Sequence, residues 1–133
     1  MKLSRLMVVN ALVAAVFGVG FVVVPGQVMS FYGPEVTPPL EYVAQLFGAA
    51  LLAFAVLTWT AKNAPDSDAR RAILLAMFVG DCVGCVVALI GQLRGVMNAL
   101  GWSTVVIYLL LAIGFGYFCF VQPKATRQAG QVM

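Results

Sequence analysis

Residues 78–87, with the sequence FVGDCVGCVV, place one carboxylic acid and two thiols within a short, otherwise apolar run. The acid is Asp81, and Cys82 and Cys85 follow it in C-x-x-C spacing. At a polar surface, this spacing is typical of redox or metal chemistry. A carboxyl group surrounded by hydrocarbon instead binds a proton or a polar ligand, or joins helices through a hydrogen bond. The elements that carry these residues decide between the two kinds of chemistry.

The elements around this run are four long apolar stretches. Of the 133 residues, 62% are hydrophobic and 10% are charged, whereas a typical soluble domain has about 25% charged residues. A helix needs about 20 apolar residues to cross the hydrocarbon layer, and backbone groups in lipid must be satisfied within the segment. We therefore predict an all-α membrane protein with one domain, residues 1–122, folded as an antiparallel bundle of four transmembrane helices. The spans cover about 6–24, 42–61, 72–93 and 103–121, and a polar tail follows at 123–133.

The first span follows two positive charges, Lys2 and Arg5, as the apolar region of a secretory signal does. The apolar region of a signal is only about 7–15 residues long and ends in a small-x-small cleavage site. This stretch is longer and ends in VVVPGQ, which has no such site. We expect the first span to be retained.

The positive charges are distributed unevenly between the two sides of the predicted bundle. Lys and Arg gather on the cytoplasmic side of membrane proteins. One side has only Arg94, so that side is expected to be the outer one, with short interfacial segments in its loops at 25–41 and 94–102. Both termini are then cytoplasmic, in a bacterial inner membrane. The charges on the cytoplasmic side are Lys2, Arg5, Lys62, Arg70, Arg71, Lys124 and Arg127. They flank spans and form no patch, so we predict no nucleic-acid partner.

Asp81 is expected near the middle of the bilayer, because it lies about halfway along the third span. An Asp at the centre of a membrane helix costs about 2.5–3.5 kcal/mol, so it should face other helices and find a partner. No Lys or Arg lies at a similar depth, which excludes an ion pair and favours the neutral acid. Two interpretations stay open. Asp81 either binds a proton or a substrate, or it forms a structural hydrogen bond with Tyr117, Thr58 or a backbone carbonyl.

Cys82 and Cys85 are interpreted as small apolar packing residues. The chain contains no histidine, and its third thiol, Cys119, lies near the cytoplasmic end of the fourth span. That position is too far along the bundle for a disulfide with Cys82. We predict no metal site, no cofactor and no catalytic residue, since no Ser/His/Asp set and no phosphate-binding loop is present.

Small residues indicate where the helices approach one another. Gly80 and Gly84 form a G-x-x-x-G pattern, and such glycines allow close packing of membrane helices. Asn10, one turn inside the first span, is expected to join helices through a hydrogen bond. The glycines predicted to serve helix packing are Gly80, Gly84, Gly18, Gly48 and Gly114.

Polar residues also gather at the outer ends of the spans. Arg94, the single outer cation, is expected to pair with Glu35 or Glu41. The functional alternative is a small pocket beneath the first outer loop, with Gln45 and Gln92 pointing inward. Together with Asp81, the candidate binding residues are therefore Glu41, Gln45, Gln92 and Arg94.

The chain resembles the small four-helix bacterial membrane proteins of the DoxX-like type. The resemblance covers most of the chain and rests on Pro-Gly at 25–26, FYG at 31–33, EYVAQLFGAALLAF at 41–54 and GW at 101–102. It implies the four-helix fold. Some DoxX-type proteins are associated with quinone-linked redox complexes, but no functional residue of theirs maps onto this sequence.

Two functions follow from the sequence as hypotheses. In the first, which the lack of catalytic sets and the short loops favour, the protein is a non-catalytic accessory or assembly subunit. It would pack against a larger membrane complex of redox, respiratory or photosynthetic kind, or associate with itself. In the second, it binds or moves a proton or a small molecule by means of Asp81.

Overall fold

A computed structural model describes residues 2–121, which are helical apart from short loops. Four helices are long and apolar enough to cross a membrane, which confirms the predicted number of spanning helices. The predicted tail at 123–133 lies outside the described residues. The helices are α1 (Leu3–Val23), α2 (Pro25–Phe31), α3 (Pro38–Ala61), α4 (Asp68–Leu93) and α5 (Gly101–Gly116), which continues as the π-helical turn η1 (Tyr117–Val121).

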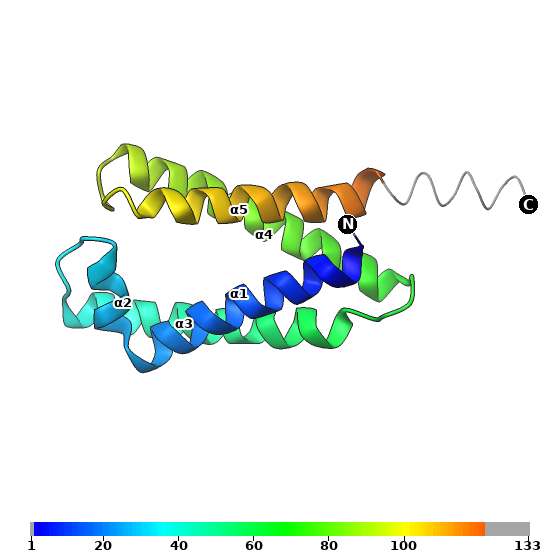
Figure 1. Ribbon diagram of the computed structural model, residues 1–133, viewed down its shortest axis with the longest axis horizontal. Helices are drawn as coiled ribbons and strands as arrows, with labels where there is room; N and C mark the ends of the chain where they lie inside the picture. The colour runs from blue at the N-terminus through cyan, green and yellow to red at the C-terminus, as the bar shows by residue number, and fades with distance from the viewer. Residues whose placement is uncertain (1, 122–133) are drawn as a thin grey trace, which may run out of the picture.

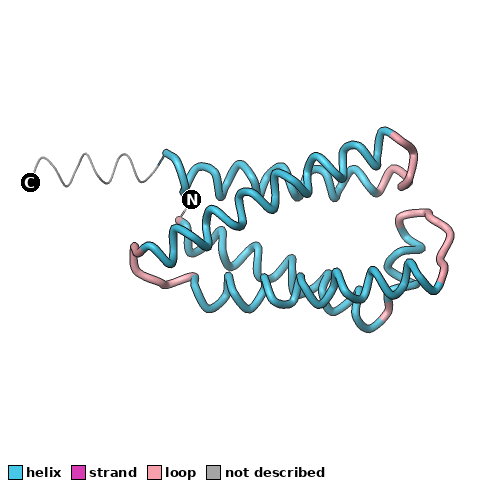
Figure 2. The backbone as a smooth tube through the Cα atoms, turned by 180° about the vertical axis from the view of Figure 1, so that it is seen from behind, coloured by secondary structure: helices cyan, strands magenta, loops and turns pink. Residues whose placement is uncertain are grey.

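The four long helices form two pairs, α1 with α3 and α4 with α5 (Figure 1). Contact between the pairs is much smaller than contact within them, and it involves mainly α1 and α5. The start of α1 and the 62–67 loop lie at one end of the molecule, and the loops at 32–37 and 94–100 lie at the other (Figure 2). We call the first the basic end, because Lys2, Arg5, Lys62, Arg70 and Arg71 lie there, and the second the opposite end.

The two pairs meet at the basic end in an apolar cluster. Met7 of α1 and Phe115 of α5 have no exposed surface at all. Burial of such side chains against one another provides the packing that holds membrane helices together in the absence of water. We call this group the basic-end cluster; it consists of Leu6, Met7, Ala61, Leu74, Met77, Phe115 and Phe118.

At the opposite end the pairs are joined by hydrogen bonds. The short helix α2 begins at Pro25, and Pro is favoured at a first helical position because its missing N–H would be unpaired there anyway. After α2, Tyr32 accepts a hydrogen bond of 2.8 Å from the backbone N–H of Asn98, and Phe31 accepts one of 2.9 Å from the Asn98 side chain. Asn98 therefore connects the loop after α4 to the segment that follows α1.

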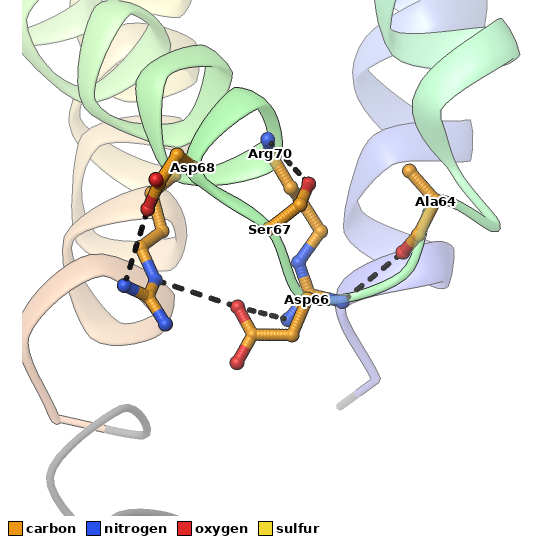
Figure 3. Close-up of polar contacts among 6 residues, drawn as sticks. Ala64, Asp66, Ser67, Asp68 and Arg70 are labelled. Carbon is orange, nitrogen blue, oxygen red and sulfur yellow. Dashed lines mark hydrogen bonds and ion pairs between the residues drawn. The ribbon is translucent and has the colours of Figure 1, made fainter.

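The 62–67 loop links the two pairs at the basic end (Figure 3). Ser67 caps α4, because its hydroxyl accepts a hydrogen bond from the Arg70 N–H at 3.2 Å. The Arg70 guanidinium donates to the Ala64 carbonyl, and Asp66 lies 3.4 Å from the Arg71 Nε. These contacts fix the position at which the chain passes from α3 to α4.

Candidate functional site

Asp81 of α4 is buried, with only 6% of its surface exposed. Its Oδ2 atom is fully enclosed and has no hydrogen-bond partner among residues 2–121. The buried polar side chains in this part of the protein are Asp81, Asn10 of α1 and Thr58 of α3. Burial toward the protein matches the expectation for an intramembrane acid, but the expected hydrogen bond is missing.

Each of the three buried polar residues lies about one helical turn from a member of the basic-end cluster. Asn10 follows Met7 by about one helical turn, Thr58 precedes Ala61 by about one turn, and Asp81 follows Met77 by about one turn. Met7, Ala61 and Met77 all belong to the basic-end cluster. The polar residues therefore follow this cluster directly on the way to the opposite end.

Asn10 and Thr58 satisfy each other. The Asn10 amide donates to the Thr58 hydroxyl at 3.3 Å, which confirms the predicted role of Asn10 in joining helices. Thr58 in turn donates to the Phe54 carbonyl at 2.8 Å, a bond within its own helix. The prediction that Thr58 or Tyr117 bonds to Asp81 is therefore not met. The Thr58 hydroxyl is used elsewhere, and the side chain of Tyr117 is half-exposed on the turn after α5.

Tyr108 of α5 contacts α4 one turn beyond Asp81, at Gly84, and the sequence analysis does not single it out. Its ring lies so close to Gly84 that a Cβ atom at residue 84 would collide with it. Gly84 and Asp81 are three residues apart and share a helical face. The sequence contains one indication of this contact, because Gly84 and Tyr108 lie at similar sequence separations before and after the 94–100 loop.

The packing glycines behave differently from one another. Gly18 of α1 and Gly48 of α3 face each other backbone to backbone, so that a Cβ at residue 48 would lie 2.9 Å from the Gly18 carbonyl oxygen. Gly84 contacts the Tyr108 ring, and Gly114 contacts the side chain of Leu6. Gly80, by contrast, lies on the exposed side of α4 with no atom near the position of a Cβ. Its predicted packing role is therefore not fulfilled within this chain.

The three thiols are free, and each is partly buried. Cys85 lies against α5, with its Sγ atom 3.9 Å from the Val105 carbonyl oxygen. Within residues 2–121, no group of three or more His, Cys, Asp or Glu side chains could hold a metal ion. The position of Cys85 is that of a packing residue at the α4–α5 interface.

The polar residues at the opposite end do not converge on one pocket. A shallow hollow of about 490 Å³ under the start of α2 is lined by Glu41, but not by Gln45, Gln92 or Arg94. Gln45 donates to the Val22 carbonyl at 3.2 Å, and Gln92 donates to the Asn98 carbonyl at 2.9 Å. Arg94 is exposed, and the ion pairs of the described chain do not include the predicted ones with Glu35 or Glu41.

Comparison with known proteins does not extend these observations. No family model matches the chain, and neither a curated protein nor a solved structure does. Of the sequence-derived candidates, Asp81 is the one that is both buried and without a partner.

Proposed function

We propose that this protein is an integral membrane protein that binds a proton at Asp81, inside the bilayer. The observation that carries the proposal is the enclosed Oδ2 atom without a hydrogen-bond partner. A buried carboxyl that serves only to join helices would be hydrogen-bonded, as Asn10 and Thr58 are, because an unpaired buried polar group costs about 1–3 kcal/mol.

The surroundings of Asp81 favour a proton over a larger ligand. Oδ2 is fully enclosed and only 6% of the Asp81 surface is exposed, so a proton, which needs no additional space, can bind there without movement of the helices. The ion pairs of the described residues, all formed by Arg70 and Arg71 at the basic end, leave Asp81 without a cationic partner. Without a cationic partner, the charge of this carboxyl is neutralised by taking up a proton.

Infrared spectroscopy of the reconstituted protein tests this function. The carbonyl band of a protonated carboxylic acid should be present in the wild type and missing in Asp81→Asn. It should disappear reversibly when the pH is raised, with an unchanged far-ultraviolet circular dichroism spectrum. Glu41→Gln is a matched control, which should keep the band because Glu41 lies at the opposite end. A wild-type protein without a titrating band would disprove the proposal.

A second candidate function, the accessory subunit favoured by the sequence, is supported by a different face of α4. Ala72, Ala76 and Gly80 are exposed and follow one another at four-residue spacing. Small residues at this spacing let a second membrane helix approach closely. In this proposal Ala72, Ala76 and Gly80 pack against a helix of a larger membrane complex or of a second copy.

Cross-linking distinguishes the two candidates. With the native cysteines replaced by alanine, Ala76→Cys should form cross-links to a partner in native membranes, whereas Leu110→Cys, on an exposed face of α5, should not. Gly80→Leu should then release the protein from the partner in mild detergent. If Ala76→Cys forms no cross-link and the protein purifies alone, the accessory function is wrong.

We also propose an antiparallel order of the four spans in a bacterial inner membrane, with both termini in the cytoplasm. The support is that the described Lys and Arg residues other than Arg94 lie together at the basic end, as cytoplasmic charges do. In the same cysteine-free background, an impermeant thiol reagent should label Ala99→Cys from the outside and leave Ala64→Cys unlabelled. The reverse pattern would invert the orientation.

A further inference from the structure

The two sides of Asp81 differ in polarity, and this difference bears on how a proton reaches the carboxyl. The inference rests on the proposed proton binding and concerns the path to the same site. Toward the basic end, the neighbouring layer is the basic-end cluster, which consists of apolar side chains from all four spans. Met77 and Leu74 of this cluster precede Asp81 on α4 by one and two turns and are buried. A proton cannot be relayed through such a layer, because its side chains offer no suitable donor or acceptor.

Toward the opposite end, polar side chains lie along the α4–α5 interface. Tyr108 contacts Gly84, one turn beyond Asp81. Thr104 precedes Tyr108 by four residues, so it lies on the same face of α5 one turn closer to the 94–100 loop. Gln92 of α4 ends the series, since a Cβ atom at Gly101 would collide with its Oε1.

These residues lie at depths between Asp81 and the 94–100 loop. From Asp81 to Gln92 the rise along α4 is about 16 Å at 1.5 Å per residue. Gln92 donates to the Asn98 carbonyl, and Asn98 lies in the exposed loop. Over this distance α4 belongs to the α4–α5 pair, whose two helices are joined by the 94–100 loop (Figure 1). Hydroxyl groups both donate and accept hydrogen bonds, which is the property that a proton relay needs.

We propose that Asp81 exchanges its proton along the α4–α5 interface, through Tyr108 and Thr104, with the side of the membrane at which residues 94–100 lie. The basic-end cluster closes the other direction. The titratable groups around the site are Tyr108 from α5 and Cys82 and Cys85 from α4 itself. The buried polar residues of α1 and α3, Asn10 and Thr58, do not titrate. The relay is thus formed by one interface of the bundle.

Hydrogen–deuterium exchange of the protonated carboxyl tests the path. The infrared carbonyl band of Asp81 shifts when its proton is replaced by a deuteron, so the exchange rate is measured after dilution into D2O. Tyr108→Phe, which removes only the hydroxyl, should slow exchange by about tenfold, equivalent to roughly 1.4 kcal/mol in the barrier. Thr104→Val should slow exchange in the same direction.

Two matched controls remove the same groups elsewhere. Tyr117→Phe removes an exposed hydroxyl at the turn after α5, and Thr60→Val removes a hydroxyl that bonds to its own helix on α3. Neither should change the rate. Slower exchange in Tyr117→Phe, or unchanged exchange in both Tyr108→Phe and Thr104→Val, would disprove this path while leaving proton binding intact. Absence of the carboxyl band in the wild type would disprove proton binding itself.

Discussion

The interface between α1 and α3 and the interface between α4 and α5 use the same kinds of residue in different ways. In the first, Gly18 and Gly48 bring two backbones together, and Asn10 bonds to Thr58. In the second, Gly84 receives the ring of Tyr108, and Asp81 has an oxygen without a partner. Each interface thus combines small residues with buried polar groups, but only the second contains an enclosed side-chain oxygen without a hydrogen-bond partner.

If Asp81 binds a proton as we propose, this difference separates a structural interface from a functional one. Close backbone contact and a completed hydrogen bond both stabilise one fixed arrangement of the two helices, which is a structural role. An enclosed carboxyl without a partner lowers stability, and such costs are typical of functional sites in membranes. The α1–α3 pair is therefore the better satisfied of the two, and the α4–α5 pair is the one to which we assign the proposed proton binding.

The largest expected effect concerns the glycine contact of the structural interface. In Gly48→Ala, the new Cβ would lie 2.8 Å from the Phe21 Cβ and 2.9 Å from the Gly18 carbonyl oxygen, so the two helices must separate. Overpacking of this kind costs about 1–3 kcal/mol. The free energy of unfolding, measured by dodecyl sulfate titration in mixed micelles, should fall by that amount.

Gly80→Ala is the control for this substitution, because no atom lies near the new Cβ at residue 80. It should leave the stability of the isolated protein unchanged or raise it slightly, since Ala favours the helical backbone over Gly. Equal losses in the two variants would show that α1 and α3 do not approach through Gly48.

The second prediction concerns Asp81 and has the opposite sign. Asp81→Leu should raise the free energy of unfolding by about 1 kcal/mol, the lower end of the cost of an unpaired buried polar group. Asp81→Asn keeps an uncharged polar group and should change stability less than Asp81→Leu does. Both variants should lose the carboxyl band. Marked destabilisation by Asp81→Leu would mean that the carboxyl bonds to a neighbouring helix, as the sequence interpretation had proposed.

The third prediction compares this carboxyl with the satisfied pair. Thr58→Val removes the acceptor of the Asn10 amide and leaves that amide buried and unpaired, so it should lower the free energy of unfolding by about 1 kcal/mol, the lower end of the cost of an unpaired buried polar group. Thr60→Val is the control and should have no effect, because the Thr60 hydroxyl is exposed and bonds only within α3. If Thr58→Val lowers the free energy of unfolding no more than Thr60→Val does, the Asn10–Thr58 hydrogen bond does not stabilise the α1–α3 interface.

The sequence predicts the four helices and the burial of Asp81, but it does not predict which residues meet between α4 and α5. Apolar stretches of spanning length determine the helices, and the depth of Asp81 within its stretch predicts that it is buried. Which residue of α5 contacts the next turn of α4, at Gly84, depends on the rotation and relative height of the two helices, and hydropathy carries no information on either. The sequence therefore does not predict the contact of Tyr108 with Gly84. Gly80 was assigned to packing because spacing alone does not tell which side of α4 faces α5.

The smallest expected effect lies in the loop that joins the two pairs. Asp66 approaches the Nη2 of Arg70 at 3.9 Å and the Nε of Arg71 at 3.4 Å, and about half of its side chain is exposed (Figure 3). Exposed ion pairs contribute about 0–1 kcal/mol and are screened by salt. Asp66→Asn should therefore lower the free energy of unfolding by about 0.5 kcal/mol or less, and the difference should vanish at high salt. Ser67→Ala, which removes the cap of α4, should cost about 1 kcal/mol independently of salt. If Asp66→Asn lowered the free energy of unfolding at high salt as much as Ser67→Ala does, Asp66 would stabilise the 62–67 loop by interactions other than its ion pairs.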